Sequence, residues 1–332
     1  MQATALDVIG VGNAIVDVLA QADDAFLAAH SIAKGGMMLI DEERAREIYG
    51  AMAPGVEISG GSAANSIACV ASFGGAAGFI GKVSTDSLGD IFRHDLRALG
   101  VRFDTPPLEM GPGTARSLIN VTPDAQRSMS TFLGSASFVS SADIDAREIA
   151  TAAITFFEGY LFEQPVAREA FVKACRAANA AGRRAALTLS DAGVVDRQHG
   201  DLAAFVAAHV DILLANEREA QTLFETDRID VMINRARELC PLTAITMSER
   251  GSILVPRGGE VVRVKAFTPE KLVDTTGAGD AYAAGLLFGL ARGLALQTAG
   301  ALGALAAAEV ISHFGARPQA SLKALAVEAG LL

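Results

Sequence analysis

The regular alternation of short apolar runs with amphipathic helical stretches most restricts the fold of this chain. Strands are expected at residues 6–11, 77–83, 153–157, 185–189, 212–214 and 242–247. Helices are expected at residues 62–73, 86–99, 165–181, 278–290 and 294–314, and one more is expected between the strands at 185–189 and 212–214. Because strands joined through helices run parallel, this order predicts a mostly parallel sheet with helices on both faces, an α/β fold.

Two stretches, at about 13–60 and 105–135, break this alternation. They carry short strand-like runs such as Ala115–Val121 and 128–133. We expect them to form a small β-sheet inserted into a single domain over residues 1–332. A small sheet over the open end of a large one can exclude water from a site. Decorating strands without a functional role are the alternative.

Composition excludes several classes of protein. The chain is 51% hydrophobic and 20% charged, which excludes wholesale disorder. Its net charge of −10 argues against nucleic-acid or anionic-membrane partners, because phosphates would be repelled. The three scattered cysteines suggest neither a disulfide framework nor a zinc site. No Lys or Arg precedes Lys34, and the longest uncharged apolar run is too short to span a bilayer. We therefore expect a reduced, soluble, cytoplasmic protein.

The segment 274–280, Asp-Thr-Thr-Gly-Ala-Gly-Asp, carries the clearest chemical signal. It ends where a long apolar helix begins, and free N–H groups at a helix start favour an anion. Gly277 and Gly279 have no Cβ, so their amides can approach a phosphate closely, and Thr275 and Thr276 add hydroxyl donors. The segment is typical of a cradle for a phosphoryl group.

Asp280 has two interpretations. It is either an N-terminal cap of the helix or a base that accepts the proton of an attacking hydroxyl. The base does not need the pKa of an alcohol, because the proton can leave late, while the bond to phosphorus forms.

The segment 274–280 resembles the C-terminal signature of the ribokinase-like (PfkB) kinases of sugars and nucleosides. The N-terminal signature of this family is similar to residues 60–66, Gly-Gly-Ser-Ala-Ala-Asn-Ser, followed by 78–83 and 86–90. The resemblance extends from about Val8 to Pro318. It implies a Rossmann-like three-layer α/β/α domain with a small β-sheet lid, and ATP-dependent phosphorylation of a hydroxyl group.

The resemblance also implies roles for single residues. It assigns Asp280 as the base and Gly277, Ala278 and Gly279 as the anion hole. It assigns the acceptor's sugar to Asn13, Asp17, Gly60, Gly61 and Asn65. From chemistry alone, Asp17 can accept two neighbouring hydroxyls, although a turn residue or cap is the alternative. A glycine turn is the alternative for Gly60 and Gly61.

ATP-binding roles follow from the same resemblance for Asn216, Glu219, Thr246, Ser248, Gly251, Thr275 and Arg127. Glu219 would order water around Mg²⁺, which keeps several waters and takes few protein ligands. Its alternative is a capping box with Asn216. For Ser248 and Gly251 the alternative is a hairpin turn, and for Arg127 a solvated side chain.

A monovalent cation such as K⁺ is a further implication of the resemblance. Asp274 and Thr276 would help to bind it, together with carbonyl groups near Ser312 and Gly315.

Several details favour a nucleoside as the acceptor. The segment 10–17 and the run from Arg127 to Leu133 resemble adenosine kinases. Met129, Thr131 and Leu133 alternate, so they share one face of a strand. With Tyr160 they would form an apolar slot for a flat base, on which an aromatic ring can stack. Core packing is the alternative for these side chains.

Other functions remain as alternatives. Within the family, the acceptor would be ribose, fructose or a related sugar. A dinucleotide-binding fingerprint fails because Ile15 stands at its third glycine, and a Walker motif fails because Val83 follows Gly81-Lys82. A non-catalytic sugar- or nucleoside-binding protein is more remote. We expect the protein to be a monomer or a homodimer.

Overall fold

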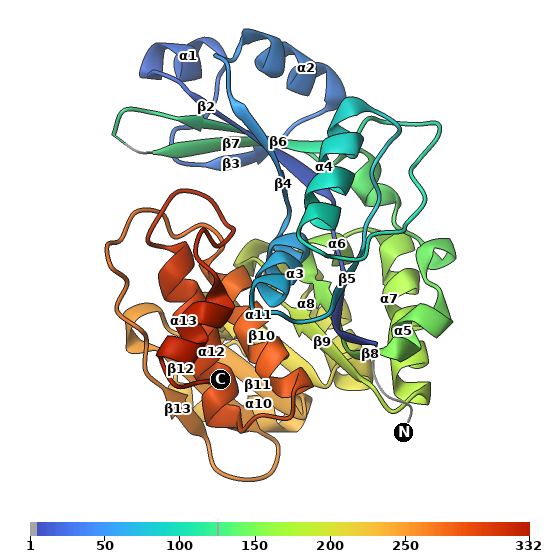
Figure 1. The fold of residues 1–332 in the computed structure, drawn as a ribbon, viewed down its shortest axis with the longest axis vertical. Coiled ribbons are helices and arrows are strands. Elements are labelled where there is room, and N and C mark those ends of the chain that lie inside the picture. The colour runs from blue at the N-terminus through green and yellow to red at the C-terminus, as the bar shows by residue number, and fades with distance from the viewer. Residues whose placement is uncertain (1–4, 125) are drawn as a thin grey trace.

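The large sheet of the protein contains eight strands within residues 5–124 and 126–332, the part of the chain that the computed structural model describes (Figure 1). In spatial order they are β13 (Val262–Val264), β12 (Ser252–Pro256), β11 (Leu242–Thr246), β10 (Ile212–Asn216), β9 (Arg184–Thr188), β8 (Ala152–Glu158), β1 (Leu6–Val11) and β5 (Ala77–Ile80). The neighbouring strands β11, β10, β9, β8, β1 and β5 pair in parallel, whereas β12 and β13 form an antiparallel edge.

Helices cover both faces of this sheet, as the alternating sequence predicts. One face packs against α3 (Ser62–Ser72), α11 (Ala278–Ala291) and α12 (Leu296–Val310), with α4 (Ser87–Ala98) and α13 (Leu322–Glu328) beside them. The other packs against α5 (Ala146–Thr151), α6 (Gly159–Phe162), α7 (Pro165–Ala180), α8 (Ala192–His209), α9 (Glu217–Leu223) and α10 (Ile229–Leu239). The three-layer α/β/α fold is therefore confirmed.

Strand β1 shows why the central strands are apolar throughout. All of its residues are buried, with Val8 in the core on the α3 and α11 side and Ile9 and Val11 in the core on the other. A strand covered on both faces is continuously hydrophobic.

A second sheet of five strands lies above the first within the described chain (Figure 1). Its spatial order is β3 (Met37–Leu39), β7 (Arg127–Phe132), β6 (Ala115–Val121), β2 (Ile15–Gln21) and β4 (Val56–Gly60). Helices α1 (Asp24–Ala29) and α2 (Glu42–Ala51) lie on the side away from the large sheet (Figure 1). The predicted small sheet is thus present.

Some predicted boundaries are wrong. Strand β5 ends at Ile80 rather than at residue 83, and α12 covers Leu296–Val310 rather than 294–314. The chain beyond α12 leaves the helix at Ile311 and turns at Gly315, where φ is 98°. Among the described residues, no helix is both long and apolar enough to cross a membrane.

A cluster of phenylalanine rings anchors α7 beneath the large sheet. The Phe171 ring centroid lies 4.5 Å from that of Phe157, and Phe171 is fully buried. We expect Phe171→Ala to lower the free energy of unfolding by about 3–5 kcal/mol, because it leaves a cavity. Val166 on the same helix is 52% exposed, so Val166→Ala should change it by less than about 0.5 kcal/mol. Urea denaturation measures both, and equal effects would show that this cluster is not a stabilising core.

Candidate active site

A cavity of about 440 Å³ lies between the small sheet and the carboxyl ends of the central strands. Its walls include residues at the ends of β1, β8, β9, β10 and β11, together with side chains of β2, β3, β6 and β7. The starts of α3 and α11 complete it. Open α/β sheets bind ligands at this edge, and the volume is within the range of small-molecule sites.

The start of α11 opens into this cavity. Gly277 is the N-cap residue and adopts a left-handed conformation with φ 79°. A Cβ at this position would lie 2.6 Å from the Cβ of Ala316, so the turn needs glycine. Gly277, Gly279 and Asp280 line the cavity, whereas Ala278 is not among its lining residues. The helix start therefore faces a cleft rather than the core.

Asp280 is held by two side chains of α3. The Ser62 hydroxyl donates to Oδ1 at 2.6 Å, and Asn65 Nδ2 donates to Oδ2 at 3.3 Å. Loss of water raises the pKa of Asp280 to about 6, although the two hydrogen bonds partly oppose this rise. Since Gly277 is the N-cap and Asp280 lies in the first turn, the interpretation of Asp280 as the cap is wrong. Ser62 is not the N-cap of α3. Gly61 is the N-cap residue, and the Ser62 hydroxyl donates to Asp280 instead.

The predicted sugar-binding residues lie at one end of the cavity. Asn13, Asp17, Gly61 and Asn65 line it, and Gly60 lies directly behind Asp17. A Cβ on Gly60 would come within 2.4 Å of Asp17 Oδ2, so glycine allows the carboxylate to lie there. Burial raises the pKa of Asp17 to about 6, and the positive charges of Arg317 and Arg127 limit the rise.

The sequence interpretation missed Arg317. Its Nη1 donates to Ser59 Oγ at 2.6 Å, and its Nε donates to Asn65 Oδ1 at 3.3 Å. It thus fixes the Asn65 amide that contacts Asp280. No local pattern marked this arginine, because only the tertiary fold brings the segment after α12 to α3.

Glu158 at the end of β8 was missed as well. Its carboxylate is buried and accepts hydrogen bonds from Asn13 N at 2.8 Å, Asn13 Nδ2 at 2.5 Å and Ala63 N at 2.7 Å. It joins the segment after β1 to the start of α3. Burial raises the pKa of Glu158 to about 7, although the three hydrogen bonds oppose the rise. The sequence signal that could have identified Glu158 is an acidic residue directly after the apolar run of a central strand.

Asn216 and Glu219 form a reciprocal capping box at the start of α9. Glu219 N donates to Asn216 Oδ1 at 2.9 Å, and Asn216 N donates to Glu219 Oε2 at 2.9 Å. Both residues also line the cavity. Burial, together with the charges of Asp191 and Asp280, raises the pKa of Glu219 to about 7. The structural interpretation is therefore correct, and it leaves Glu219 at the cavity wall.

Arg127, Asp274 and Thr276 contact one another. Arg127 Nη1 of β7 forms an ion pair with Asp274 and lies 3.3 Å from Thr276 Oγ1. Asp274 also accepts from Thr276 N at 3.0 Å and from Gly315 N at 3.2 Å, and these contacts hold its pKa below the usual range despite burial. The alternative of a solvated Arg127 side chain is wrong. The ion pair engages Nη1 of Arg127, whereas its Nε has no hydrogen-bond partner among the described residues.

The remaining predicted residues divide into two groups. Thr246 lines the cavity, whereas Ser248, Gly251 and the exposed Thr275 are not among its lining residues. Ser248 and Gly251 form the turn between β11 and β12, with Gly251 N donating to Ser248 O at 3.0 Å. The hairpin interpretation of this segment is correct.

Met129, Thr131, Leu133 and Tyr160 all line the cavity, and Tyr160 is 37% exposed. Met129 and Leu133 belong to an apolar part of the wall on the small sheet, which we call the apolar end. Further apolar side chains from the small sheet extend this wall, namely Ile15, Met37, Leu39 and Ile119. The alternative of plain core packing is therefore wrong for Met129, Leu133 and Tyr160, because these side chains face a cavity.

The chain is similar to several known proteins. The model of the pfkB family of carbohydrate kinases matches residues 36–323. A solved structure of a probable sugar kinase protein from Rhizobium etli is 45% identical, covers 99% of this chain and 100% of that chain, and has a TM-score of 0.92. The adenosine kinase structure from Sinorhizobium meliloti is 47% identical, covers 98% and 99%, and has a TM-score of 0.90. Adenosine kinase of Saccharomyces cerevisiae is 26% identical over 326 residues, 92% of this chain and 94% of the relative.

The family match and the kinase relatives indicate a phosphotransferase that acts on an alcohol group, and the cleft beside Asp280 and the start of α11 is consistent with this class. The chain belongs to the PfkB family of carbohydrate kinases. Membership implies ATP as the co-substrate and usually a divalent metal ion.

Two glycines of the α11 start provide a matched pair for a test. Gly277→Ala should lower the free energy of unfolding by about 1–3 kcal/mol, because alanine is strained at φ 79° and its Cβ meets Ala316. At Gly279 a Cβ meets nothing within 4 Å, so Gly279→Ala should change the free energy of unfolding by less than about 0.5 kcal/mol. Chemical denaturation measures both values, and a tolerated Gly277→Ala would contradict the described turn.

Proposed function

We propose that the protein transfers the terminal phosphoryl group of ATP to the 5′-hydroxyl of a purine nucleoside, with adenosine as its acceptor. The observation that carries this proposal is the position of Asp280. It lies at the start of α11, in a cavity that is lined by the polar Asp17 and by the apolar Met129 and Leu133. In this proposal the ribose lies against Asp17 and the flat base against Met129 and Leu133. The relatives named adenosine kinase support this acceptor.

In the proposed mechanism, Asp17 and Asn13 hold the ribose so that its 5′-oxygen lies beside Asp280. Ser62 and Asn65 keep the Asp280 carboxylate in place. The 5′-oxygen attacks the γ-phosphorus, the bond from that phosphorus to the β,γ-bridging oxygen breaks, and Asp280 takes the hydroxyl proton. The products are AMP, ADP and a proton that Asp280 later returns to solvent. The N–H groups at the start of α11 stabilise the charge on the transferred group.

Mg²⁺ fits the carboxylates of this cavity. Glu219 lies at the cavity wall, where its carboxylate accepts hydrogen bonds from Asn216 N and Asn216 Nδ2, and the charges of Asp191 and Asp280 act on it. Among the described residues, no group of three or more acidic, His or Cys side chains could hold a metal ion. Mg²⁺ would therefore be held through water by Glu219 and by the phosphates of ATP, and it would supply positive charge to the phosphates.

For K⁺ the side chains fit less well. The carboxylate of Asp274 already pairs with the Arg127 guanidinium, and Thr276 is part of the same contact. We derive no step from K⁺.

Replacement of the proposed base tests the mechanism. We expect Asp280→Asn to lower kcat by at least about 10²–10⁴-fold, because no group remains to take the hydroxyl proton. The dissociation constant for ATP should stay within about threefold, since the N–H groups of α11 remain. Coupled ADP release and calorimetric titration measure the two quantities. Asp230→Asn, on the exposed surface of α10, is the matched control. Full activity of Asp280→Asn would refute the assignment.

The pH dependence follows from the raised pKa of Asp280. A base must be deprotonated, so kcat/KM should be constant at alkaline pH and should fall as pH drops through about 6. In the ligand-free protein the sign for stability is opposite. Because the folded-state pKa lies above the unfolded value, the charged carboxylate costs stability at high pH, and this cost decreases as pH falls from about 6 to the unfolded pKa of 3.8. A pH–rate profile without an acid limb near this value would contradict the proposal.

A panel of acceptors separates a nucleoside kinase from a sugar kinase. We expect adenosine to give the highest kcat/KM in an ADP-release assay, with ribose and fructose at least about 10²-fold lower, because they leave the apolar end unfilled. The control is Tyr160→Ala, which should raise the KM for adenosine more than the KM for ribose. Equal or higher kcat/KM for a free sugar would assign the alternative function.

A further inference from the structure

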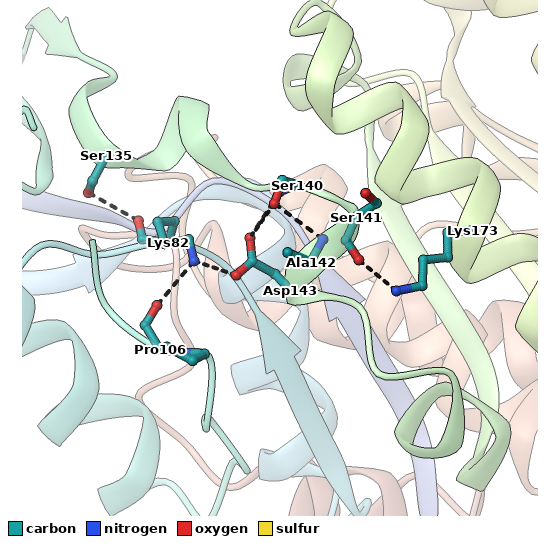
Figure 2. Close-up of polar contacts among 8 residues, drawn as sticks. All are labelled: Lys82, Pro106, Ser135, Ser140, Ser141, Ala142, Asp143 and Lys173. Carbon is teal, nitrogen blue, oxygen red and sulfur yellow. Dashed lines mark hydrogen bonds and ion pairs between the residues drawn. The ribbon is translucent and has the colours of Figure 1, made fainter. Parts of the chain in front are cut away.

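Lys82 is a buried cation that lies outside the site described above. Its side chain is 11% exposed, and its Nζ forms an ion pair with Asp143, whose side chain is 6% exposed. Nζ also donates to the carbonyl oxygen of Pro106 at 3.2 Å, and the carbonyl oxygen of Lys82 itself accepts from Ser135 Oγ at 3.2 Å (Figure 2). The second oxygen of Asp143 accepts from Ser140 N at 2.9 Å. Both charged groups are therefore held in one orientation.

The cluster of Lys82, Pro106, Ser135 and Asp143 lies at the base of the β6–β7 hairpin. Residues 104–114 carry the chain from the edge of the large sheet into β6, and residues 133–143 carry it back from β7. Lys82 follows β5 and contacts both connections, Pro106 on the way in and Ser135 and Asp143 on the way out. The connections into and out of the β6–β7 hairpin thus both contact Lys82 (Figure 2).

Backbone contacts reinforce the same junction. Leu108 N donates to Val83 O at 2.8 Å, and Ser135 N donates to Gly113 O at 2.9 Å. The first bond ties the incoming connection to the segment that follows β5, and the second ties the two connections to each other. The hairpin is therefore supported from its base, and little freedom remains for it to tilt independently of β5.

The hairpin carries much of the apolar end of the cavity. Ile119 of β6, Met129 and Thr131 of β7, and Leu133 directly after β7 all line it. Leu133 lies only two residues before Ser135, whose hydroxyl contacts Lys82. A shift at the base of the hairpin would therefore move these side chains relative to Asp280, and small displacements from productive geometry are costly in catalysis.

We propose that Lys82 and Asp143 are positioning residues for the acceptor, which they act on by fixing the β6–β7 hairpin over the apolar end of the cavity. The proposal rests on the proposed function in one respect, because it takes this end of the cavity as the acceptor site. Neither residue touches the acceptor. Their bonds to the two connections are directional, so an apolar pair that fills the same volume does not replace them.

Three variants separate positioning from plain stabilisation. Lys82→Met and Asp143→Asn each leave one buried partner unpaired, so both should lower the melting temperature. The double variant Lys82→Met/Asp143→Leu leaves no unpaired charge, so its melting temperature should lie above those of both single variants, although Ser140 N and the Pro106 carbonyl lose a partner. Arg228→Met, which breaks an exposed ion pair to Asp230 on α10, is the control and should change nothing.

The kinetic readout decides the question. In the double variant we expect the KM for adenosine to rise about tenfold, with the KM for ATP and kcat within about twofold of the parent. A double variant with the stability and the adenosine KM of the parent would overturn the proposal, since the pair would then be a structural contact only.

A readout without substrate keeps this test independent of the proposed function. In ligand-free protein, amide hydrogens of β6 and β7 should exchange faster in the double variant than in the parent, whereas those of β8–β11 should be unchanged. If the parent phosphorylates no acceptor of the panel, the proposed function fails. The positioning role of Lys82 and Asp143 is then tested by hydrogen exchange alone. Unchanged exchange in β6 and β7 would overturn the positioning role.

Discussion

The start of α11 depends on one backbone conformation. Gly277 adopts a left-handed conformation against Ala316, and this turn places the start of α11 at the cavity and brings Asp280 opposite α3. Ser62 and Asn65 then hold the carboxylate from the other helix. Because α11 packs on the large sheet beside α3, the position of Asp280 is set by the core as well as by the loop. The proposed anion-binding helix start and the proposed base thus both depend on one turn.

Burial of acids gives the cavity its electrostatic character. Asp17, Glu158, Glu219 and Asp280 all have raised pKa values, and desolvation is the largest cause in each case. A triphosphate that enters such a cavity meets negative charge, and the helix start alone offsets only part of it. ATP accompanied by a divalent cation therefore suits this site better than free ATP. The same burial prepares Asp280 to act as a base, because its raised pKa increases its affinity for a proton.

The sequence predicted the elements whose signals are local. Alternating apolar runs identified the central strands and the helices that cover them, and the segment 274–280 identified the helix start at the cavity. The sequence did not predict Arg317 and Glu158, because their roles depend on contacts between segments far apart in the chain. The ion pair of Arg127 with Asp274 escaped for the same reason, since it joins the small sheet to the loop before α11. Ser248 and Gly251 lie in the hairpin turn between β11 and β12, and their predicted contact with the nucleotide stays a prediction.

The most direct test of the central claim is a crystal structure with adenosine and a non-hydrolysable ATP analogue bound together. The account predicts that the 5′-oxygen of adenosine lies about 2.6–3.2 Å from a carboxylate oxygen of Asp280, with the terminal phosphate at the amides of Gly277 to Asp280. A 5′-oxygen out of reach of Asp280, or a phosphate bound away from the start of α11, would contradict it.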